Sequence, residues 1–316
     1  MNNKKYDIVA LGEAMVEFNQ TDPDRPIYLQ GFGGDTSNAA IAAARAGAHS
    51  AYLTRLGEDT FADSLLSLWE SEGICTQGIE MEAESLTGIY FVTHTEKGHV
   101  FTYRRAGSAA SRMTPAWLHG APKQIIEQSK WLHLSGISLA ISESACETAF
   151  AAIRIAKSAD TLISLDSNLR LKLWSLERAQ AVITSAIKDC DVFLPSMDDM
   201  IPLTNLSDPE LVVDWSHAQG ARRVVLKLGA EGALISDPES GLRTIVKAHP
   251  VEALDATGAG DCFCGNLLAR LAANDDLLTA TRYANAAASI AVQGWGALSS
   301  LPTPIAVKNR LASTAI

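Results

Sequence analysis

The hydrophobic positions of this sequence fall into short apolar runs separated by longer stretches of mixed polarity. The first run, Tyr6–Leu11, has the length of a buried strand and ends at Gly12 and Glu13. From residue 131 onward such runs alternate with helix-length segments, which predicts βα repeats and a doubly wound, mainly parallel sheet flanked by helices. The predicted strands are 131–134, 161–165, 192–194 and 223–228, and the predicted helices are about 143–157, 176–188, 209–219 and 277–292.

Two runs of β-branched and aromatic residues in the first third of the chain have a different pattern. Residues 87–95 and 100–105, separated by a short polar segment, predict a β-hairpin. With a segment near 27–29 they would form a small antiparallel sheet outside the main domain, and one of its faces would need cover to be stable. Because side chains alternate along a strand, Tyr103 and Arg105 share a face.

Composition places the chain among globular proteins. Its 316 residues are 47% hydrophobic, which is enough for one large α/β domain with a small appendage. No apolar run has the length of a membrane span, and the N-terminus lacks the apolar region of a signal peptide. The five cysteines form no CxxC pair, which favours reduced thiols over a disulfide or zinc framework. We therefore expect a cytoplasmic protein.

The formal net charge of −10 argues against nucleic acid or an anionic membrane as a partner. The same charge is unfavourable for an anionic substrate. Distant acids are largely screened, however, because the Debye length is about 8 Å at physiological salt. Basic residues close to a binding site would then decide whether an anion binds.

The late stretch 255–261, Asp-Ala-Thr-Gly-Ala-Gly-Asp, precedes an apolar run and predicts a glycine-rich loop that leads into a buried helix. Free N–H groups at such a helix start suit an anion, for example a phosphate group in transfer. A carboxylate beside this anion is unfavourable unless it has a task, and Asp261 could accept a proton from an attacking hydroxyl. The alternative is that Asp261 only caps the helix and the glycines only make a turn.

An early stretch, Gly33-Gly34-Asp35-Thr36-Ser37-Asn38, opens a second helix of small residues. Its glycine spacing does not give GxGxxG, which argues against a dinucleotide-binding fold. Together, the early GGxxxN and the late DxxGAGD resemble the paired signatures of the ribokinase-like (PfkB-type) carbohydrate kinase family. The resemblance implies an ATP- and Mg²⁺-dependent kinase with one ribokinase-like domain over 1–316 and a β lid formed by about 13–35 and 87–110. It also implies a homo-oligomer formed through that lid.

The resemblance also implies roles for individual residues. Asp261 would be the catalytic base, with Gly258, Ala259 and Gly260 donating N–H groups to the transferring group. The implied substrate-binding residues are Gly33, Gly34, Asn38, Tyr90, Tyr103, Arg105, Arg170 and Asp261. The implied ATP-binding residues are Asn168, Ser196, Lys227, Gly229, Gly232, Gly258, Ala259, Gly260 and Asn285. Ser196 and Asp199 stand where the family has Asn and Glu, and Asp199 would contact Mg²⁺ through water or phosphate; a monovalent cation near Asp255 is left open.

The lid sequence is similar to the 2-keto-3-deoxygluconate kinase branch of this family, in which two tyrosines and two arginines hold the sugar acid. Arg104 departs from the tyrosine usual at its position. The planar fork of an arginine matches a carboxylate, and such a bond contributes roughly 1.5–3 kcal/mol. Tyr90 could instead serve only to pack the hairpin, and Arg170 could instead form a salt bridge with Asp166. The whole protein could instead be a fructokinase, another sugar or nucleoside kinase of the family, or a non-catalytic sugar-binding regulator.

Overall fold

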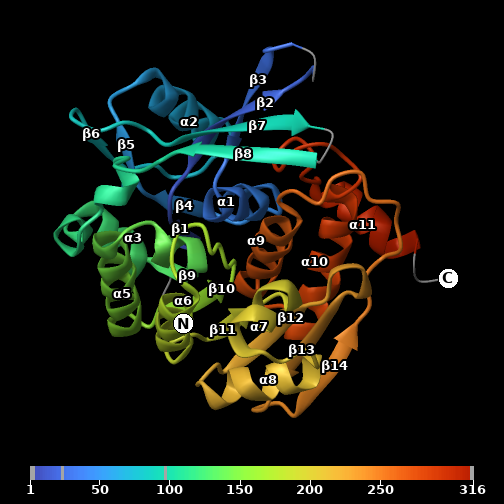
Figure 1. The fold of residues 1–316 in the computed structure, drawn as a ribbon. Coiled ribbons are helices and arrows are strands. Elements are labelled where there is room, and N and C mark those ends of the chain that lie inside the picture. Colours follow the sequence, from blue (N-terminus) through green and yellow to red (C-terminus); the bar gives the residue numbers. More distant parts are fainter. Residues whose placement is uncertain (1–3, 23–24, 96–97, 314–316) are drawn as a thin grey trace.

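An eight-stranded sheet forms the centre of the molecule (Figure 1), in the order β14-β13-β12-β11-β10-β9-β1-β4. The computed structural model describes residues 4–22, 25–95 and 98–313. Strands β4 to β12 of this sheet are parallel, whereas β13 and β14 are antiparallel to their neighbours. The predicted mainly parallel, doubly wound sheet is confirmed. The strands are β1 (Tyr6–Leu11), β4 (Ser50–Leu53), β9 (Ser129–Ser135), β10 (Leu162–Asp166), β11 (Val192–Leu194), β12 (Arg223–Lys227), β13 (Ala233–Asp237) and β14 (Leu242–Val246).

Helices cover both faces of this sheet (Figure 1), as the buried clusters also show. One face packs against α3 (Ala121–Glu127), α4 (Gly136–Ala140), α5 (Glu143–Ser158), α6 (Leu176–Ile187), α7 (Met197–Thr204) and α8 (Pro209–Ala218). The other packs against α1 (Asp35–Arg45), α9 (Ala259–Ala272) and α10 (Leu277–Ala291), with α2 (Thr60–Ser71) and α11 (Pro304–Ser313) beside them. Short 3₁₀ turns are η1 (Ala110–Arg112), η2 (Pro115–Leu118) and η3 (Gly229–Glu231). None of the helices described is long and apolar enough to span a bilayer.

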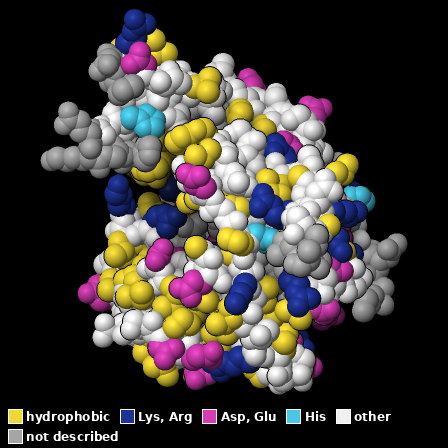
Figure 2. Space-filling view, turned by 90° about the vertical axis from the view of Figure 1, so that its right-hand side faces the viewer, with side chains coloured by type: hydrophobic (Ala, Val, Ile, Leu, Met, Phe, Trp, Pro, Cys, Tyr) yellow, Lys and Arg dark blue, Asp and Glu magenta, His cyan; other side chains and the backbone are white. Residues whose placement is uncertain are grey.

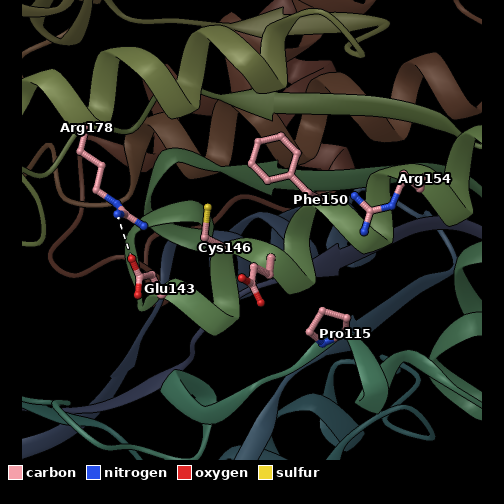
Figure 3. Close-up of a pocket in the computed structure, with 7 residues that line it drawn as sticks. Pro115, Glu143, Cys146, Phe150, Arg154 and Arg178 are labelled. Carbon is pink, nitrogen blue, oxygen red and sulfur yellow. Dashed lines mark hydrogen bonds and ion pairs between the residues drawn. The ribbon is translucent and has the colours of Figure 1, made fainter.

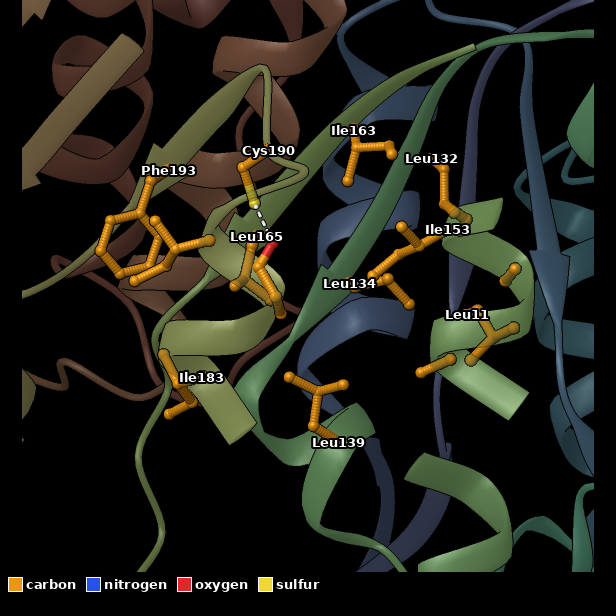
Figure 4. Packing of buried hydrophobic residues seen from close by; sticks show 14 of the residues in the cluster. Leu11, Leu132, Leu134, Leu139, Ile153, Ile163, Leu165, Ile183, Cys190 and Phe193 are labelled. Atoms are coloured by element: carbon orange, nitrogen blue, oxygen red, sulfur yellow. Dashed lines mark hydrogen bonds between the residues drawn. The ribbon is translucent and has the colours of Figure 1, made fainter. Parts of the chain in front are cut away.

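The central strands are apolar at nearly every position, so their side chains pack into the hydrophobic clusters on both faces of the sheet. Leu132 and Leu134 of β9 belong to the cluster under α4 to α6 (Figure 4). Trp131 on the same strand belongs to the cluster under α9. This is the pattern expected of parallel strands buried on both sides. Burying each such side chain contributes about 1.5–3 kcal/mol. The five cysteines are free thiols, and Cys190 belongs to the first cluster.

A smaller four-stranded sheet lies above the body of the molecule (Figure 1), in the order β3-β2-β7-β8. The predicted hairpin is its β7–β8 pair, although part of the turn lies outside the described residues. The sequence did not indicate β2, which runs antiparallel to β3 and parallel to β7. The strands are β2 (Met15–Gln20), β3 (Tyr28–Gly33), β7 (Ile89–Thr95) and β8 (Gly98–Arg104), and a separate pair is β5 (Arg55–Gly57) with β6 (Glu80–Glu82).

The chain passes between the small sheet and the body four times, and all four crossings gather around Glu13. Glu13 itself precedes β2. At the end of β3, a Cβ on Gly34 would lie 2.6 Å from the carbonyl oxygen of Glu13, and the φ of Gly34 is +119°. At the start of β7, a Cβ on Gly88 would lie 2.8 Å from Glu13 Oε1. Arg105, just after β8, forms an ion pair with the Glu13 carboxylate. Glycine is therefore required at two of the crossings.

Candidate active site

The glycine-rich loop leads into α9 as predicted from its sequence. Gly258 precedes the helix in the left-handed conformation, with φ +73°, and a Cβ there would lie 2.7 Å from that of Ala297. No side chain caps this helix start, so N–H groups of the first turn remain available to an anion. The Ala259 N–H is an exception, because it donates to the Ala256 carbonyl in this conformation.

Asp255 fixes the shape of this loop. One of its carboxylate oxygens accepts the N–H of Thr257 at 2.9 Å, and the other accepts the N–H of Gly296 at 2.9 Å. The carboxylate therefore ties the loop before α9 to the segment that follows α10. Both oxygens are occupied by backbone donors, so the structure gives no separate support to a cation held at this residue.

Asp261 does not cap its helix. It lies in the first turn of α9, and its Oδ2 accepts a hydrogen bond of 2.8 Å from the Asn38 side chain on α1. Burial, followed by the nearby charge of Asp35, raises the pKa of Asp261 to about 7. A carboxyl group with a pKa near neutrality can both accept and release a proton at physiological pH. The local geometry therefore fits a general base better than a helix cap.

The early motif brings acceptor oxygens to the same place. Asn168 donates to Asp35 Oδ2 at 2.8 Å, but Asp35 Oδ1 is buried without a hydrogen-bond partner among the described residues. The same is true of Asn38 Oδ1. Buried acceptors without donors are costly, so a ligand rich in hydroxyl groups would satisfy them. Gly33 leaves room for Tyr90 at this place, because a Cβ there would overlap the Tyr90 hydroxyl.

Two tyrosines of the small sheet, Tyr90 and Tyr103, lie beside this group. Tyr90 donates to Glu17 Oε2 at 2.5 Å, and its ring centroid lies 5.6 Å from that of Tyr103. Burial raises the pKa of Tyr90, and the negative charges of Glu17 and Asp261 raise it further. Because such effects need proximity, Tyr90 on β7 of the small sheet lies near Asp261. The packing alternative for Tyr90 is therefore incomplete, since its hydroxyl also joins the polar site.

Arg105 and Arg170 both reach the Tyr103 side of the site, but neither carries an isolated charge. Burial raises the pKa of Tyr103, and the charges of Arg105 and Arg170 oppose that rise. Arg105 pairs with Glu13. Arg170 Nη1 lies 4.0 Å from Asp199 and donates to the Leu169 carbonyl at 2.7 Å. The alternative of an Arg170–Asp166 salt bridge is not observed, because Asp166 has another partner.

That partner is Lys227, at the end of β12. Its Nζ lies 2.8 Å from Asp166 Oδ1, and Cys264 of α9 donates to Asp166 Oδ2 at 3.3 Å. Burial opposes the ionisation of Asp166, but the Lys227 ammonium outweighs it and holds the pKa of Asp166 below its usual value. A Cβ on Gly260 would lie 3.7 Å from Lys227 Nζ, so this ion pair sits directly beneath the start of α9.

Asp199 lies in the first turn of α7, which Ser196 caps through the Asp199 N–H. Its Oδ2 accepts a hydrogen bond of 2.6 Å from Ser167, and burial raises its pKa. The described residues contain no cluster of three or more side chains able to hold a metal ion. Asp199 could supply one carboxylate to Mg²⁺, with water and phosphate oxygens as the other ligands, which is a common way for proteins to bind this ion.

The remaining predicted residues shape the backbone around the site through a hydrogen bond or through unusual φ angles. Asn285 donates to the Val246 carbonyl at 2.8 Å at the end of β14 and is buried. Gly229 and Gly232 have φ of +59° and +105° in the turn between β12 and β13. Asn168 has φ +23°, an unusual backbone conformation for a residue with a side chain, and this geometry delivers its amide to Asp35.

Two concave regions can be compared. Figure 2 shows a hollow beneath the protruding small sheet, edged by basic and acidic side chains. A separate cavity of about 520 Å³ lies on the outer side of α5 (Figure 3) and contains none of the predicted site residues. It is lined by Pro115, Glu143, Cys146, Glu147, Phe150, Arg154 and Arg178, and Arg178 pairs with Glu143 at 3.2 Å. The converging polar groups place the candidate site at the first region.

The sequence predicts no site role for Asp35 or Glu13, whereas Asp166 follows the predicted strand 161–165 and so falls at the carboxyl edge of the sheet, where ligands bind. Asp35 directly follows the two glycines of the early motif, and this position carried a signal that could have been used. Glu13 also follows a predicted strand, but nothing in the sequence indicates its partner Arg105, which is distant along the chain. These carboxylates come together only through the fold.

Comparison with known proteins gives a family match over nearly the whole chain. The family model described as "pfkB family carbohydrate kinase" matches residues 5–304. Fructokinase-1 of Oryza sativa subsp. japonica is 31% identical, with 95% of this chain and 96% of that protein covered. The 2-dehydro-3-deoxygluconokinase of Escherichia coli strain K12 is 30% identical, with coverage of 92% and 96%.

Solved structures agree with these relatives. The crystal structure of the fructokinase from Vibrio cholerae O395, with fructose, ADP and calcium ion bound, has a TM-score of 0.85 to this structure. It is 29% identical, and the match covers 96% of this chain and 98% of the other. Relatives named for two different sugars are thus about equally similar to the chain.

Proposed function

The chain belongs to the pfkB family of carbohydrate kinases, and from this we propose that it transfers the γ-phosphoryl group of ATP to the primary hydroxyl of 2-keto-3-deoxygluconate, giving the 6-phosphate. The family and the ribokinase-like fold predicted from the two motifs are confirmed, and the protein is an ATP-dependent sugar kinase. The identity of the sugar is our proposal.

The convergence of Arg105 and Arg170 on Tyr103 supports a sugar acid. Burial raises the pKa of Tyr103, and the positive charges of Arg105 and Arg170 both oppose that rise, which requires both side chains to lie in the neighbourhood of this tyrosine. The carboxylate of a sugar acid beside Arg105 and Arg170 would accept charge-assisted hydrogen bonds. The unpaired oxygens of Asp35 and Asn38 would accept hydrogen bonds from the hydroxyl groups of the same sugar. These are the two kinds of partner that a sugar acid needs.

We propose that Asp261 takes the proton of the attacking hydroxyl while Asn38 holds its carboxylate in place. The free N–H groups at the start of α9 would stabilise negative charge on the transferring group, with Lys227 beneath them. Mg²⁺, when bound, neutralises phosphate oxygens, and Asp199 would hold it through water. The small sheet would exclude water as a lid.

The remaining assignments are proposals of the same kind. Apolar side chains on the small sheet are exposed, such as Leu29 at 66% and Val100 at 48%, which fits a homo-oligomer formed through this sheet. The free thiols are in keeping with a reducing compartment such as the cytoplasm. ADP and a divalent cation in the Vibrio cholerae structure support the assignment of ATP with Mg²⁺.

A neutral keto sugar such as fructose is the second candidate, and one observation favours it. Arg105 is already paired with the buried Glu13, so its charge is not free for a substrate carboxylate. Hydroxyl groups could still use Arg105 as a donor. This alternative keeps Asp261 and the α9 loop in the same roles and changes only the contacts of the small sheet.

ADP release with Mg-ATP across a panel of sugars tests the proposed substrate. The panel is 2-keto-3-deoxygluconate, 2-keto-3-deoxygalactonate, gluconate, fructose and ribose. We expect turnover to be confined to the keto-deoxy acids. A preference for fructose or ribose would establish the second candidate, and no release with any sugar would favour a non-catalytic sugar-binding regulator.

The pH profile should report the ionisation of Asp261. A base must be ionised to accept a proton, and the pKa of Asp261 is raised to about 7. We therefore expect kcat/KM to fall about tenfold per pH unit below that value and to level off above it. Initial rates from pH 5 to 9 would measure this, and an activity plateau reaching down to pH 5 would contradict the assignment.

A further inference from the structure

We propose that Glu13 is a specificity-determining residue of the sugar site: its buried carboxylate offsets the charge of Arg105 and so limits the advantage of an anionic sugar acid over a neutral sugar. This inference rests on the proposed function, because it concerns the sugar that the same site accepts. Glu13 belongs to neither sequence motif, and its importance comes from its place in the fold.

The contacts of Glu13 show that its charge is matched by Arg105. The Glu13 side chain is fully buried, and that of Arg105 is 11% exposed. Ser108 donates to Glu13 Oε1 at 2.5 Å, while Arg105 Nη2 lies against Oε2. Arg105 Nη2 and Glu13 Oε2 are both buried, and neither has a hydrogen-bond partner elsewhere in the described part of the chain. Each charge of this pair is therefore compensated by the other.

Glu13 is also unable to withdraw when a ligand arrives. It sits where the four crossings between the small sheet and the body meet. Its Oε1 would be only 2.8 Å from a Cβ on Gly88, so the carboxylate fills the space that this glycine leaves. The Ser108 hydroxyl holds it from another side. The carboxylate is thus held in a fixed position beside Arg105; burial raises the pKa of Glu13, and the Arg105 charge and the Ser108 hydrogen bond oppose that rise and favour its ionised form.

A fixed carboxylate behind Arg105 changes what that arginine can select. A ligand carboxylate would be attracted by the guanidinium and repelled by Glu13 a few ångströms farther away, so on the order of half of the attraction cancels. Arg170 is different, because its side chain is 54% exposed and its nearest carboxylate, on Asp199, is 4.0 Å away. Any preference for an acid should then depend on Arg170 more than on Arg105, and removing the Glu13 charge should increase it.

The test replaces the charge and keeps the shape. In Glu13→Gln, we expect the ratio of kcat/KM for 2-keto-3-deoxygluconate to that for fructose to rise roughly tenfold, because one uncompensated charge near a ligand charge is worth about that much. The ratio is independent of how much enzyme is folded. Calorimetric affinities for the two sugars give the same ratio where turnover with one of them is slow. Glu72→Gln is the matched control, because Glu72 pairs with Arg45 at 2.6 Å at the far end of α1.

A second comparison covers the case in which Glu13→Gln does not fold. In Arg105→Gln the Glu13 charge has no partner and should repel the sugar acid. The ratio of kcat/KM for the acid to that for fructose should therefore be higher in the double variant Glu13→Gln/Arg105→Gln than in Arg105→Gln alone. Equal ratios in this pair, or an unchanged ratio in Glu13→Gln, would overturn the proposal. Failure of the proposed function would look different, because it would appear in the wild-type protein, as a preference for fructose or ribose or as no turnover with any sugar, and not as a ratio that stays equal between variants.

Discussion

Asp261→Asn is expected to lower kcat by about 10²–10⁴-fold while leaving the affinities for ATP and sugar nearly unchanged. The amide keeps the size of the side chain and can still accept the hydrogen bond from Asn38, but it cannot take a proton. Steady-state kinetics and calorimetric binding would separate the two effects. Near-normal turnover in this variant would rule out Asp261 as the base.

The same variant should be more stable than the wild type near neutral pH. Burial raises the pKa of Asp261 to about 7 in the folded protein, so its ionised form is unfavourable there relative to the unfolded chain. The unfolding free energy contributed by this group falls as pH rises from about 4 to 7, and asparagine removes that loss. A higher Tm at pH 8, but not at pH 4, would confirm the sign. Asp214→Asn, an exposed surface change, should alter neither kcat nor Tm.

Lys227→Met is expected to cost about 3–5 kcal/mol of stability, because it leaves the buried Asp166 carboxylate without its cation. It should also lower kcat, since the ammonium lies beneath the start of α9. Denaturant unfolding would measure the first effect and initial rates the second. Lys157→Met is the matched control: its partner is Asp189 on the surface, and exposed pairs contribute about 0–1 kcal/mol.

The double variant Asp166→Asn/Lys227→Met should recover much of the lost stability, because no buried charge is then left unpaired. Activity should stay low, since the cation near the α9 loop is still missing. If Lys227→Met alone were as stable as the wild type, the Asp166–Lys227 pair would not be the interaction that holds β10, β12 and α9 together at this edge.

The main sheet could be predicted because its strands are apolar on both faces. Val192–Leu194 and Tyr6–Leu11 stand out in the sequence for this reason, and the structure has strands with the same bounds. Strand β2 was missed, since the sequence Met-Val-Glu-Phe-Asn-Gln mixes apolar and polar residues in a way that fits neither a fully buried strand nor a strict alternation. Its place is fixed by pairing with β3 and β7, which is tertiary information.

The candidate site divides in the same way. Residues within the two motifs could be found, because local spacing alone implies a helix start beside glycines, as for Asn38 and Asp261. Pairs formed across the fold could not be found. Glu13 meets Ser108 across 95 positions of sequence, and Lys227 meets Asp166 across 61. No local sequence pattern indicates such a contact. The sequence therefore could not show that the charges of Arg105 and Lys227 are matched by Glu13 and Asp166.

The small sheet also bears on how proteins of this kind diverge. Its strands come from two chain segments, 15–33 and 89–104, that leave and rejoin the body around Glu13. Changes within these segments can remodel the sugar contacts without disturbing the eight-stranded sheet or the loop that opens α9. The two parts of the proposed site thus lie on separate parts of the fold, so substitutions in the small sheet could change which sugar fits while the phosphate-binding loop stays the same. Relatives that share one fold but are named for different sugars are consistent with this division.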